Sequence, residues 1–498
     1  MTKKKLDVLR DLRIGNQVAE EEPDTLREYF VQTDTWRTIY RGEIDIVYGA
    51  KGAGKSAIYV LIQQHENDLA KKGIILVAAE NVRGDPAFSA LVVDPPASER
   101  EFESLWKIYF LSLIGREFKI QGFECEEART LISALETASL LPSRGMSLSS
   151  ILRTAQSFVR KRFGGVETTV HFDQHSGGVT GITGRIVFDE PTPDDRKSGD
   201  VSVAELFDVV NTALAKERKR LWLLLDRLDV AFDDSADLEK NALRALFRAY
   251  LSLNSYQRVV LKIFLRSDIW NRITEGGFRE ATHLSRDRTI TWDTASLKNL
   301  LVSRLISNHA IRGYYRATKT KVLQDVAEQD RLFYKVFPAQ VRVGAKQSTT
   351  MDWLIKRTAD GTGKSSPREL VLFLKSLRDV QIRRLEHGEP DPPGETLFDR
   401  AAFEQALVVV SEYRTTKVLY AEHPDLKELI EGLRGTKSEQ DIKSLMKVWG
   451  KKEDEAKGLA SRLVTIGFFE YRADSGTFWV PYVYRPYLVT CPPEVPSL

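Results

Sequence analysis

Residues 44–67 read IDIVYGAKGAGKSAIYVLIQQHEN, and this stretch decides the fold predicted for the region around it. Residues 44–48 are apolar except for Asp45, as in a short buried strand, and residues 56–67 have the spacing of a helix. The segment between them is rich in glycine. A strand, a glycine-rich loop and a helix in this order are the local context of a phosphate-binding loop.

The loop itself, GAKGAGKS at residues 49–56, satisfies the pattern G-x-x-x-x-G-K-[ST]. Its glycines permit backbone conformations that turn successive N–H groups toward an anion, and the following helix directs its positive dipole end the same way. We predict that Lys55 neutralises β- and γ-phosphate oxygens and that the Ser56 hydroxyl binds Mg²⁺. A glycine-rich turn that matches by chance is the alternative. The predicted cofactors are ATP and Mg²⁺, and the predicted cofactor-binding residues are Gly49, Gly52, Ala53, Gly54, Lys55, Ser56 and Ala57.

An acid at the end of a second buried strand would complete such a site, because the Mg²⁺ ion and its water need an anchored carboxylate beside the loop. Asp226 follows the most apolar stretch of the chain, LWLLL at residues 221–225. We predict that Asp226 binds near Mg²⁺ and meets Lys55 across adjacent strand tips, and a helix-capping role is the alternative. No [NT]KxD element follows this strand, which favours adenine over guanine.

The residue that activates the attacking water is open. Arg227 stands directly after Asp226, so no glutamate is available there. Asp229 could polarise the water or cap the following helix. Glu80 follows the apolar run 73–79 and could reach the water if its strand lies next to the phosphate loop. A solvated surface charge is the favoured alternative for Glu80.

Two arginines are predicted to sense the nucleotide. Arg266 follows the apolar run 259–265, and a cation at the carboxyl end of such a strand can sense the γ-phosphate; a plain ion pair is an equal alternative. Arg368 lies in SPRE, residues 366–369, where proline opens a helix. There it could couple the nucleotide to the position of a lid, with an ordinary surface arginine as the alternative. The predicted catalytic residues are Asp226, Asp229, Glu80, Arg266 and Arg368, and the predicted metal ligands are Ser56 and Asp226.

The predicted elements divide the chain into four parts. The fold class is α/β: a P-loop NTPase parallel sheet with a helical lid subdomain and a C-terminal winged-helix-like domain. The N-terminal arm carries four aromatic residues and is expected to pack onto the domain that follows it. The parts are an N-terminal arm (1–40), a P-loop ATPase domain (41–290, with an insertion at about 142–200), a helical lid (291–390) and a winged-helix-like domain (391–498).

Within these parts the finer pattern predicts individual elements. The insertion has β-prone pieces at 166–172 and 181–188. The last hundred residues predict four helices and a hairpin, at 400–413, 424–433, 438–448, 453–466 and 468–484.

Composition excludes several classes of protein. At 498 residues the chain is long enough for two to four domains of about 100–200 residues each. The formal net charge is only +3, from 73 basic and 70 acidic residues, so no global field favours nucleic acid or membranes. Two distant cysteines exclude a disulfide scaffold. No run of about 18 apolar residues occurs, which predicts a cytoplasmic protein without a membrane segment.

The motifs VYGAKGAGKSAIY, LLLDRLD, KIFLRSDIW, ITWDTASLKNLLVSRL and SPRELVLFLK together resemble bacterial P-loop ATPases of the AAA/STAND kind. The resemblance is closest to a group with a GxKGxGKSA loop and an LDRLD acidic strand, and it covers about residues 25–385 and the end of the chain. It implies the phosphate and Mg²⁺ roles for Lys55 and Ser56, and sensor roles for Arg266 or Ser267 and for Arg368. Such ATPases usually have an acidic residue directly after the aspartate that is linked to Mg²⁺, and this chain has Arg227 there. The difference affects the expected rate of hydrolysis more than the expected nucleotide binding.

Two functions are predicted, with a degenerate structural ATPase as a third. The first is an ATP-binding and ATP-hydrolysing switch or scaffold, a homo-oligomer that controls an effector protein in an anti-phage defence or signalling assembly, as the resemblance implies. The second is an ATP-dependent DNA- or RNA-binding, loader-like protein that uses its winged helix. Against the second, the expected recognition helix 453–465 begins with three acidic residues, which would repel phosphates.

Overall fold

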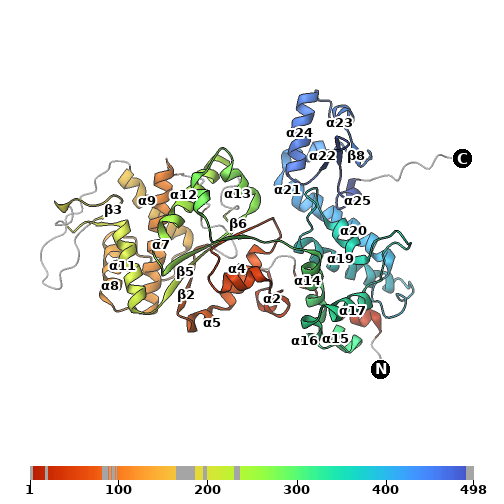
Figure 1. Ribbon diagram of the computed structural model, residues 1–498, viewed down its shortest axis with the longest axis horizontal. Coiled ribbons are helices and arrows are strands. Elements are labelled where there is room, and N and C mark those ends of the chain that lie inside the picture. Colours follow the sequence, from red (N-terminus) through yellow and green to blue (C-terminus); the bar gives the residue numbers. More distant parts are fainter. Residues whose placement is uncertain are drawn as a thin grey trace. The chain divides into compact units, whose positions relative to one another are not determined.

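The computed structural model describes residues 4–16, 21–80, 88, 91, 96, 98–163, 185–194, 199–228 and 236–488. The chain divides into two compact units (Figure 1). The sheet unit comprises Asp34–Ala50 and Lys55–Ile290, and the helical unit comprises Met1–Thr33, Lys51–Gly54 and Thr291–Leu498. None of the described helices has both the length and the apolar composition needed to span a membrane.

Five strands among the described residues form a parallel sheet in the order β2-β5-β6-β1-β7. Figure 1 labels β2, β5 and β6. β1, β5 and β6 are buried almost throughout, as expected for strands covered by helices on both faces. The predicted α/β class is confirmed, and the carboxyl ends of the strands lie at one edge of the sheet. The bounds are Ile46–Gly49 (β1), Ile74–Ala78 (β2), Arg220–Leu225 (β5), Val259–Arg266 (β6) and Asp287–Thr289 (β7).

The edge strand β7 is not anticipated by the sequence pattern, because its three residues are polar and show no apolar alternation. Backbone pairing holds it instead: it runs parallel to β1, and the Ile290 N–H donates to the Tyr48 carbonyl oxygen at 2.7 Å. Arg288 adds an ion pair with Asp34 at 2.6 Å. A hydrophobic pattern cannot signal a strand of this kind, since main-chain hydrogen bonds decide it.

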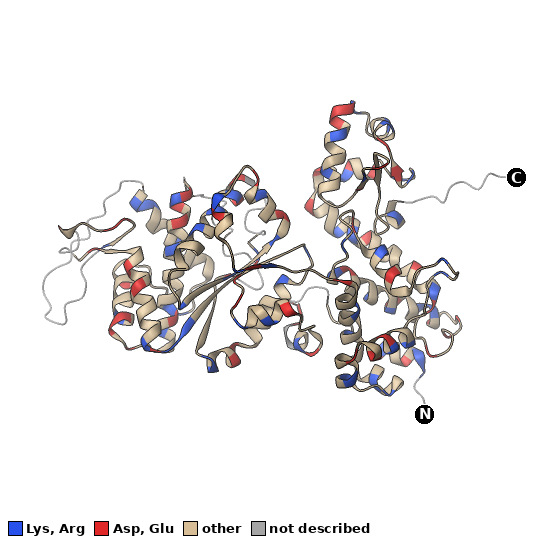
Figure 2. Cartoon of the chain, in the orientation of Figure 1, with Lys and Arg blue, Asp and Glu red and all other residues tan. Residues whose placement is uncertain are grey.

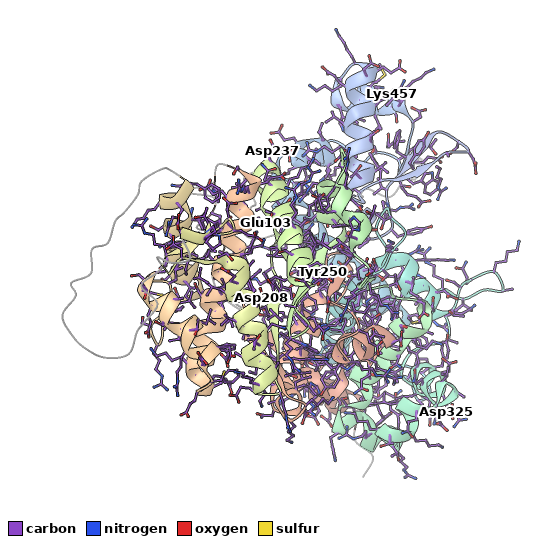
Figure 3. All side chains as sticks on the ribbon, turned by 60° about the vertical axis from the view of Figure 1, so that its left-hand side comes forward. Glu103, Asp208, Asp237, Tyr250, Asp325 and Lys457 are labelled. Carbon is purple, nitrogen blue, oxygen red and sulfur yellow. The ribbon has the colours of Figure 1, made fainter. Side chains whose placement is uncertain are left out.

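Helices α8, α9, α11 and α12 of the sheet unit contact α7, whose apolar side chains are almost all buried. The Trp106 indole N–H of α7 donates to the Ala242 carbonyl oxygen of α12 at 2.9 Å, which ties these two neighbouring helices together. Figure 3 labels Glu103 on α7 and Tyr250 on α12. The helices are α3 (Asp34–Tyr40), α4 (Lys55–Gln64), α5 (Glu66–Lys71), α7 (Glu99–Gln121), α8 (Glu126–Thr137), α9 (Leu148–Phe163), α11 (Val203–Lys216), α12 (Ala236–Leu253) and α13 (Ser267–Thr274).

The predicted insertion contains a helix that the sequence analysis did not anticipate. α9 occupies Leu148–Phe163, and its residues Ile151, Leu152, Ala155 and Val159 pack into the core beside α7. The serines that precede and follow its first apolar residue obscured the helical spacing. Of the two β-prone pieces, 166–172 lies outside the described residues, and the other contains β3 (Ile186–Val187), which pairs with β4 (Val201–Ser202).

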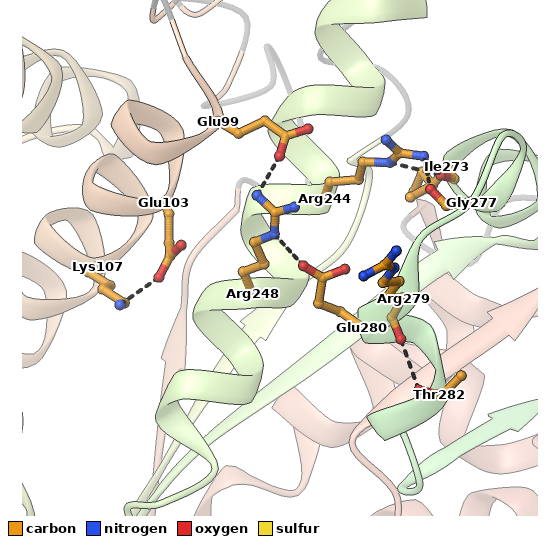
Figure 4. Close-up of polar contacts among 10 residues, drawn as sticks. All are labelled: Glu99, Glu103, Lys107, Arg244, Arg248, Ile273, Gly277, Arg279, Glu280 and Thr282. Atoms are coloured by element: carbon orange, nitrogen blue, oxygen red, sulfur yellow. Dashed lines mark hydrogen bonds and ion pairs between the residues drawn. The ribbon is translucent and has the colours of Figure 1, made fainter.

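Two arginines of α12 fix the elements around the end of α13 (Figure 4). Arg244 donates to the carbonyl oxygen of Ile273 at 2.9 and 2.8 Å, which satisfies a carbonyl at the end of that helix. Arg248 binds Glu280 at 2.8 Å and also contacts Glu99 at the start of α7. Because α13 follows β6 directly, these contacts hold the carboxyl end of β6 in place.

The first two helices of the N-terminal arm pack within the helical unit. α1 (Lys5–Asp11) contacts α15 and α19, and α2 (Pro23–Tyr29) contacts α14, all within the helical unit. Burial of apolar side chains explains this packing, because Val8, Leu9 and Leu12 are fully buried in the core of that unit. Only α3 belongs to the sheet unit, where Trp36 lies 5.6 Å from the His65 ring. Residues 4–16 and 21–33 therefore belong to the helical unit, which the sequence analysis did not anticipate because it weighed the aromatic residues and overlooked this apolar helix.

The helical unit has a lid of helices, as predicted. Residues 319–336 form two helices, because Asp325 caps the second: its side chain accepts from the Ala327 N–H at 2.8 Å. The lid helices are α14 (Thr294–Ile306), α15 (His309–Tyr315), α16 (Lys319–Gln324), α17 (Val326–Val336), α18 (Thr350–Thr358) and α19 (Pro367–Glu386).

A winged-helix-like domain follows α20 (Arg400–Tyr413). Three of its described strands form an antiparallel sheet in the order β8-β10-β9, and the predicted hairpin is confirmed by the pairing of β9 with β10. Residues 438–448 were expected to be helical throughout, but they begin with β8, because Glu439 and Gln440 pair with β10. The elements are α22 (Lys427–Glu431), β8 (Glu439–Gln440), α23 (Ile442–Trp449), α24 (Glu453–Thr465), β9 (Glu470–Arg472) and β10 (Thr477–Trp479).

A buried ion pair holds β1 at its amino end. Lys262 of β6 and Asp45 are 1% and 2% exposed, and their charged atoms are 2.8 Å apart. Asp45 also binds Arg286 at 2.9 Å and accepts from the Tyr250 hydroxyl at 3.3 Å. Burial lowers the pKa of Lys262, and the Asp45 carboxylate opposes that shift. The carboxylate thus joins β1, β6, α12 and the segment before β7.

We expect Lys262→Met to lower the free energy of unfolding of the sheet unit by about 3 kcal/mol, because it leaves a buried carboxylate short of one partner. Thermal and denaturant unfolding measure this loss. The control is Lys71→Met, whose ion pair with Asp68 is exposed and is worth less than about 0.5 kcal/mol. The double variant Asp45→Asn/Lys262→Met should recover part of the loss. Equal destabilisation by the Lys262 and Lys71 variants would contradict the assignment.

Candidate phosphate-binding site

The glycine-rich loop leaves β1 at Gly49 and enters α4 at Lys55. Gly52 and Gly54 have φ angles of +77° and +101°, a region that residues with side chains rarely adopt. The Lys55 ammonium donates to the carbonyl oxygens of Gly49 at 2.9 Å and Ala50 at 3.0 Å. The loop therefore curls around this ammonium group. α4 has no acidic residue in its first turn, so its positive dipole end is not offset there.

The remaining predicted cofactor-binding residues line the same turn. Ala53 is buried, whereas the residues around it are partly exposed and accessible to a ligand, namely Gly52, Gly54, Lys55, Ser56 and Ala57.

The sheet puts Arg266 beside the start of the loop. In the pairing of β6 with β1, Arg266 lies level with Gly49. Its guanidinium also binds the Asp268 carboxylate at 2.8 and 3.1 Å, so the ion pair considered as an alternative is present. Burial would raise the pKa of Asp268, but hydrogen bonding and charge from Arg266 lower it overall. The ion pair therefore holds Arg266 at the strand tip next to the loop.

Asp226 lies at the tip of β5 and is 5% exposed. The two strand tips are not adjacent as predicted, because β6 lies between β5 and β1; that Asp226 and Lys55 converge on one ligand stays a prediction. The two tips share one edge of the sheet but are two strand spacings apart, about 10 Å. The sequence could not reveal this separation, because strand order is set by long-range pairing.

Glu80 follows β2, at the far edge of the sheet. Its strand is three positions from β1, so the condition for reaching a water near the loop is not met. It is also not the solvated surface charge considered as the alternative, because it is 1% exposed. β2 pairs with β5, and the Ala79 N–H donates to Leu224 O at 2.9 Å. Glu80 therefore lies just after β2, the strand next to β5, and Asp226 lies just after β5.

Two buried tyrosines that the sequence analysis did not single out surround these acids. The Tyr59 hydroxyl of α4 donates to Glu80 O at 3.3 Å, and the Tyr109 hydroxyl of α7 donates to Ala79 O at 2.7 Å. Burial raises the pKa of Tyr59, and the Asp226 and Glu80 carboxylates raise it further. Both phenols therefore stay protonated as hydrogen-bond donors. These two hydrogen bonds depend on the order of the strands in the sheet, and no sequence pattern predicts that order.

The segment after β5 is backbone-strained. Arg227 has a φ of +56°, which costs energy for a residue with a Cβ atom. Such strain is typical of functional turns at strand tips. Asp229, the other predicted catalytic acid here, lies outside the described residues.

Arg368 contacts the loop within the helical unit. It occupies the first turn of α19, after Pro367. A Cβ atom added to Gly52 would lie 2.9 Å from the Arg368 Cβ and 2.8 Å from the Ser366 hydroxyl oxygen. Trp292 holds the neighbouring loop residue, since its indole N–H donates to Ala53 O at 2.8 Å. The sequence analysis did not single out Trp292, although it directly precedes the N-cap of α14.

A buried network joins the start of α19 to the winged-helix-like domain. Glu369 is 6% exposed and accepts from Arg414 at 2.7 Å. Arg414 begins the π-helix η5 (Arg414–Leu419), a form often found at functional sites. Burial raises the pKa of Glu369 although the Arg414 charge lowers it, and Arg414 in turn interacts with Tyr484. The residue next to Arg368 is thus fixed to the segment after α20.

Comparisons with solved structures find weak similarity. The chain is similar to the Aeropyrum pernix ORC1 protein in complex with DNA (11% identity, 93% of this chain and 91% of that chain, TM-score 0.38). It is also similar to the Aeropyrum pernix ORC2 protein in its ADPNP–ADP complexes (13%, 93% and 88%, TM-score 0.31) and to a Walker-type ATPase of Pyrococcus abyssi (12%, 96% and 98%, TM-score 0.36). No protein-family model and no curated protein sequence matches the chain. Similarity this low leaves function to be argued from the residues themselves.

We expect Gly52→Ala to destabilise the helical unit more than Gly363→Ala does. Both glycines have positive φ, +77° and +74°, but the Gly363 Cβ would meet no atom within 4 Å. Both variants therefore lose free energy of unfolding because alanine is strained at positive φ. The additional loss in Gly52→Ala measures the contact of the new Cβ atom with Ser366 and Arg368. A difference of at least about 1 kcal/mol in unfolding free energy is expected from overpacking. Equal losses in thermal unfolding would show that Arg368 does not press on the loop.

Proposed function

We propose that this chain is an ATP-binding switch of the P-loop class that hydrolyses ATP slowly. The observation that carries the proposal is the placement of two cations at one glycine-rich turn. Lys55 is enclosed by the loop, and Arg266 lies level with its first residue, Gly49. A helix N-terminus and fixed cations together suit a polyphosphate.

The start of α19 supports the same conclusion from within the helical unit. Ser366 Oγ and Arg368 Nε are buried and have no hydrogen-bond partner among the described residues. Both residues lie against Gly52. Buried donors of this kind are costly unless a ligand or water satisfies them. A phosphate oxygen at the loop would fit them.

Ser56 and Asp226 are the residues that would hold Mg²⁺. Mg²⁺ prefers hard oxygen ligands and keeps several waters and phosphate oxygens, so two protein oxygens suffice. In the described parts of the chain no cluster of three or more metal-ligating side chains occurs, which is consistent with a metal bound mainly through its nucleotide. The bound ion would supply positive charge against the phosphates. The absence of an [NT]KxD element favours adenine.

Slow hydrolysis follows from the residues near Asp226. Arg227 occupies the place where a general base would stand. Glu80 lies beside Asp226 and three strands from the loop. Among the predicted acids, Asp226 and Asp229 are therefore the better candidates to polarise a water.

The proposed switch acts through α19. Arg368 contacts the loop, and the adjacent Glu369 is bound to Arg414. Lys51, in the loop, also forms an ion pair with Glu422, which ends α21 (Tyr420–Glu422). A nucleotide that shifts Arg368 would therefore shift the segment that leads into the winged-helix-like domain.

The narrower roles stay predictions. Control of an effector by a homo-oligomer in a defence or signalling assembly comes from the resemblance to AAA/STAND ATPases. The alternative, ATP-dependent loading onto DNA or RNA, has the winged-helix-like domain in its favour.

Lys55→Ala should weaken ATP binding by about 10- to 100-fold, because a charge-assisted hydrogen bond to phosphate is worth about 1.5–3 kcal/mol. Titration with a fluorescent ATP analogue, with and without Mg²⁺, measures the affinity. Ser56→Ala should remove most of the dependence of the ATP affinity on Mg²⁺. GTP should displace the fluorescent ATP analogue from the wild-type protein only poorly.

The matched control is Lys71→Ala, an exposed lysine on α5 of the same unit, which should bind ATP as the wild type does. Unchanged ATP affinity in the Lys55 variant would refute the proposed function.

Arg368→Ala should leave ATP affinity within about tenfold of wild type but abolish the ATP-induced change in the winged-helix-like domain. Hydrogen exchange over residues 400–488 reads out that change, because local opening alters amide protection. Arg383→Ala, an exposed position on the same helix, serves as the control. A full response in the Arg368 variant would rule out coupling through α19.

A further inference from the structure

Five side chains at the wing of the winged-helix-like domain stack alternately. The Arg357 guanidinium carbon lies 3.5 Å from the Tyr482 ring centroid, and that of Arg485 lies 4.0 Å from the same ring. Arg485 also lies 5.1 Å from the Trp479 ring, and Arg472 lies 3.6 Å from it. We call these residues the arginine–aromatic ladder. Each guanidinium is held by ring contacts close enough for cation–π attraction.

The hairpin places part of the ladder on one sheet face. Arg472 pairs with Thr477, and Trp479 pairs with Glu470, in the antiparallel ladder of β9 and β10. Directly opposite residues share a face, so Arg472 and Trp479 lie on the same side. The ladder is accessible: Tyr482 is 38% exposed, and the Arg472 side chain is 42% exposed.

Positive charge prevails at Tyr482. Burial would raise the pKa of this phenol, but hydrogen bonding and charge from Arg357, and then from Arg485, lower it overall. Two carboxylates lie on the same sheet face. Glu470 accepts from Arg472 at 3.2 Å, and Glu439 pairs with Trp479 in the sheet. The ladder therefore contains three arginines, and of the two acids beside Trp479 one, Glu470, is paired with Arg472.

The helix expected to enter a DNA groove has the opposite character. α24 begins with the acidic residues Glu453, Asp454 and Glu455 (Figure 2). Two lysines near that end are paired with acids: Lys457, labelled in Figure 3, binds Glu453 at 2.7 Å, and Lys451 is 3.8 Å from Glu455. This end of the helix would repel the phosphates on either side of a major groove.

We propose that the arginine–aromatic ladder binds single-stranded nucleic acid. A base would stack on the plane of the Arg472 guanidinium that faces away from Trp479, and phosphates would accept hydrogen bonds from guanidinium N–H groups of the ladder. A single strand fits better than a duplex, because its bases are free to stack, whereas duplex bases expose only their edges. This binding is separate from the nucleotide site and requires neither Lys55 nor Asp226.

Fluorescence anisotropy with labelled oligothymidine and oligouridine of about 20 nucleotides tests the proposal on the full chain. Affinity should fall as salt rises, because each phosphate contact to a single strand contributes about 0.7 to the log–log slope. Arg472→Ala and Tyr482→Ala should each weaken binding at least about fivefold, and Arg472→Ala should also lower the slope. Arg472→Lys keeps the positive charge but removes the planar guanidinium group that stacks. Its affinity should therefore lie between those of Arg472→Ala and the wild type.

Two controls separate the alternatives. Lys457→Ala on α24 changes one basic residue outside the ladder and should bind as the wild type does, and so should Lys71→Ala on α5, an exposed position. Thermal unfolding checks that the ladder variants are folded. The proposal is overturned if neither oligonucleotide binds with salt dependence, if folded ladder variants bind normally, or if a duplex binds more tightly and Lys457→Ala is the variant that weakens it.

Discussion

The ion pair between Asp45 and Lys262 fixes the strand that carries the phosphate-binding loop. Both side chains are almost fully buried, and a charge in such a low-dielectric environment is tolerated only with a partner and hydrogen bonds. Arg286 and Tyr250 complete the set around Asp45. The pair aligns β1 with β6 at one end of the sheet. The carboxyl ends of both strands then fall at the same edge, where Gly49 lies level with Arg266.

Strand order decides which polar groups meet at that edge. β6 separates Asp226 from the loop, and β2 brings Glu80 next to Asp226. The tips of β5 and β2 thus carry two buried acids with protonated tyrosines beside them, whereas the tips of β1 and β6 carry cations. This separation of charge along one edge suits phosphates near Lys55 and a cation nearer Asp226.

Within the helical unit, Arg368 contacts Gly52 of the loop, and the next residue, Glu369, is hydrogen-bonded to Arg414 at the start of the segment that leads into the winged-helix-like domain. The Glu369 and Arg414 side chains are 7% and 16% exposed, so little water is available to replace either partner. The wing is also tied to the lid, since Arg357 of α18 stacks on Tyr482. Side-chain contacts thus tie both the start of α19 and the wing, which are distant in sequence, to neighbouring parts of the helical unit.

The sequence by itself determined the local features: the strand, loop and helix around Lys55, the apolar strand before Asp226, the helical lid and the C-terminal hairpin. Each follows from a pattern over a few neighbouring residues. Only the tertiary structure decided that β6 separates β5 from β1, that Glu80 is buried beside Asp226, that β7 exists, and that α1 packs on α19. These outcomes depend on backbone pairing and burial between residues far apart in the chain, and no local spacing encodes them.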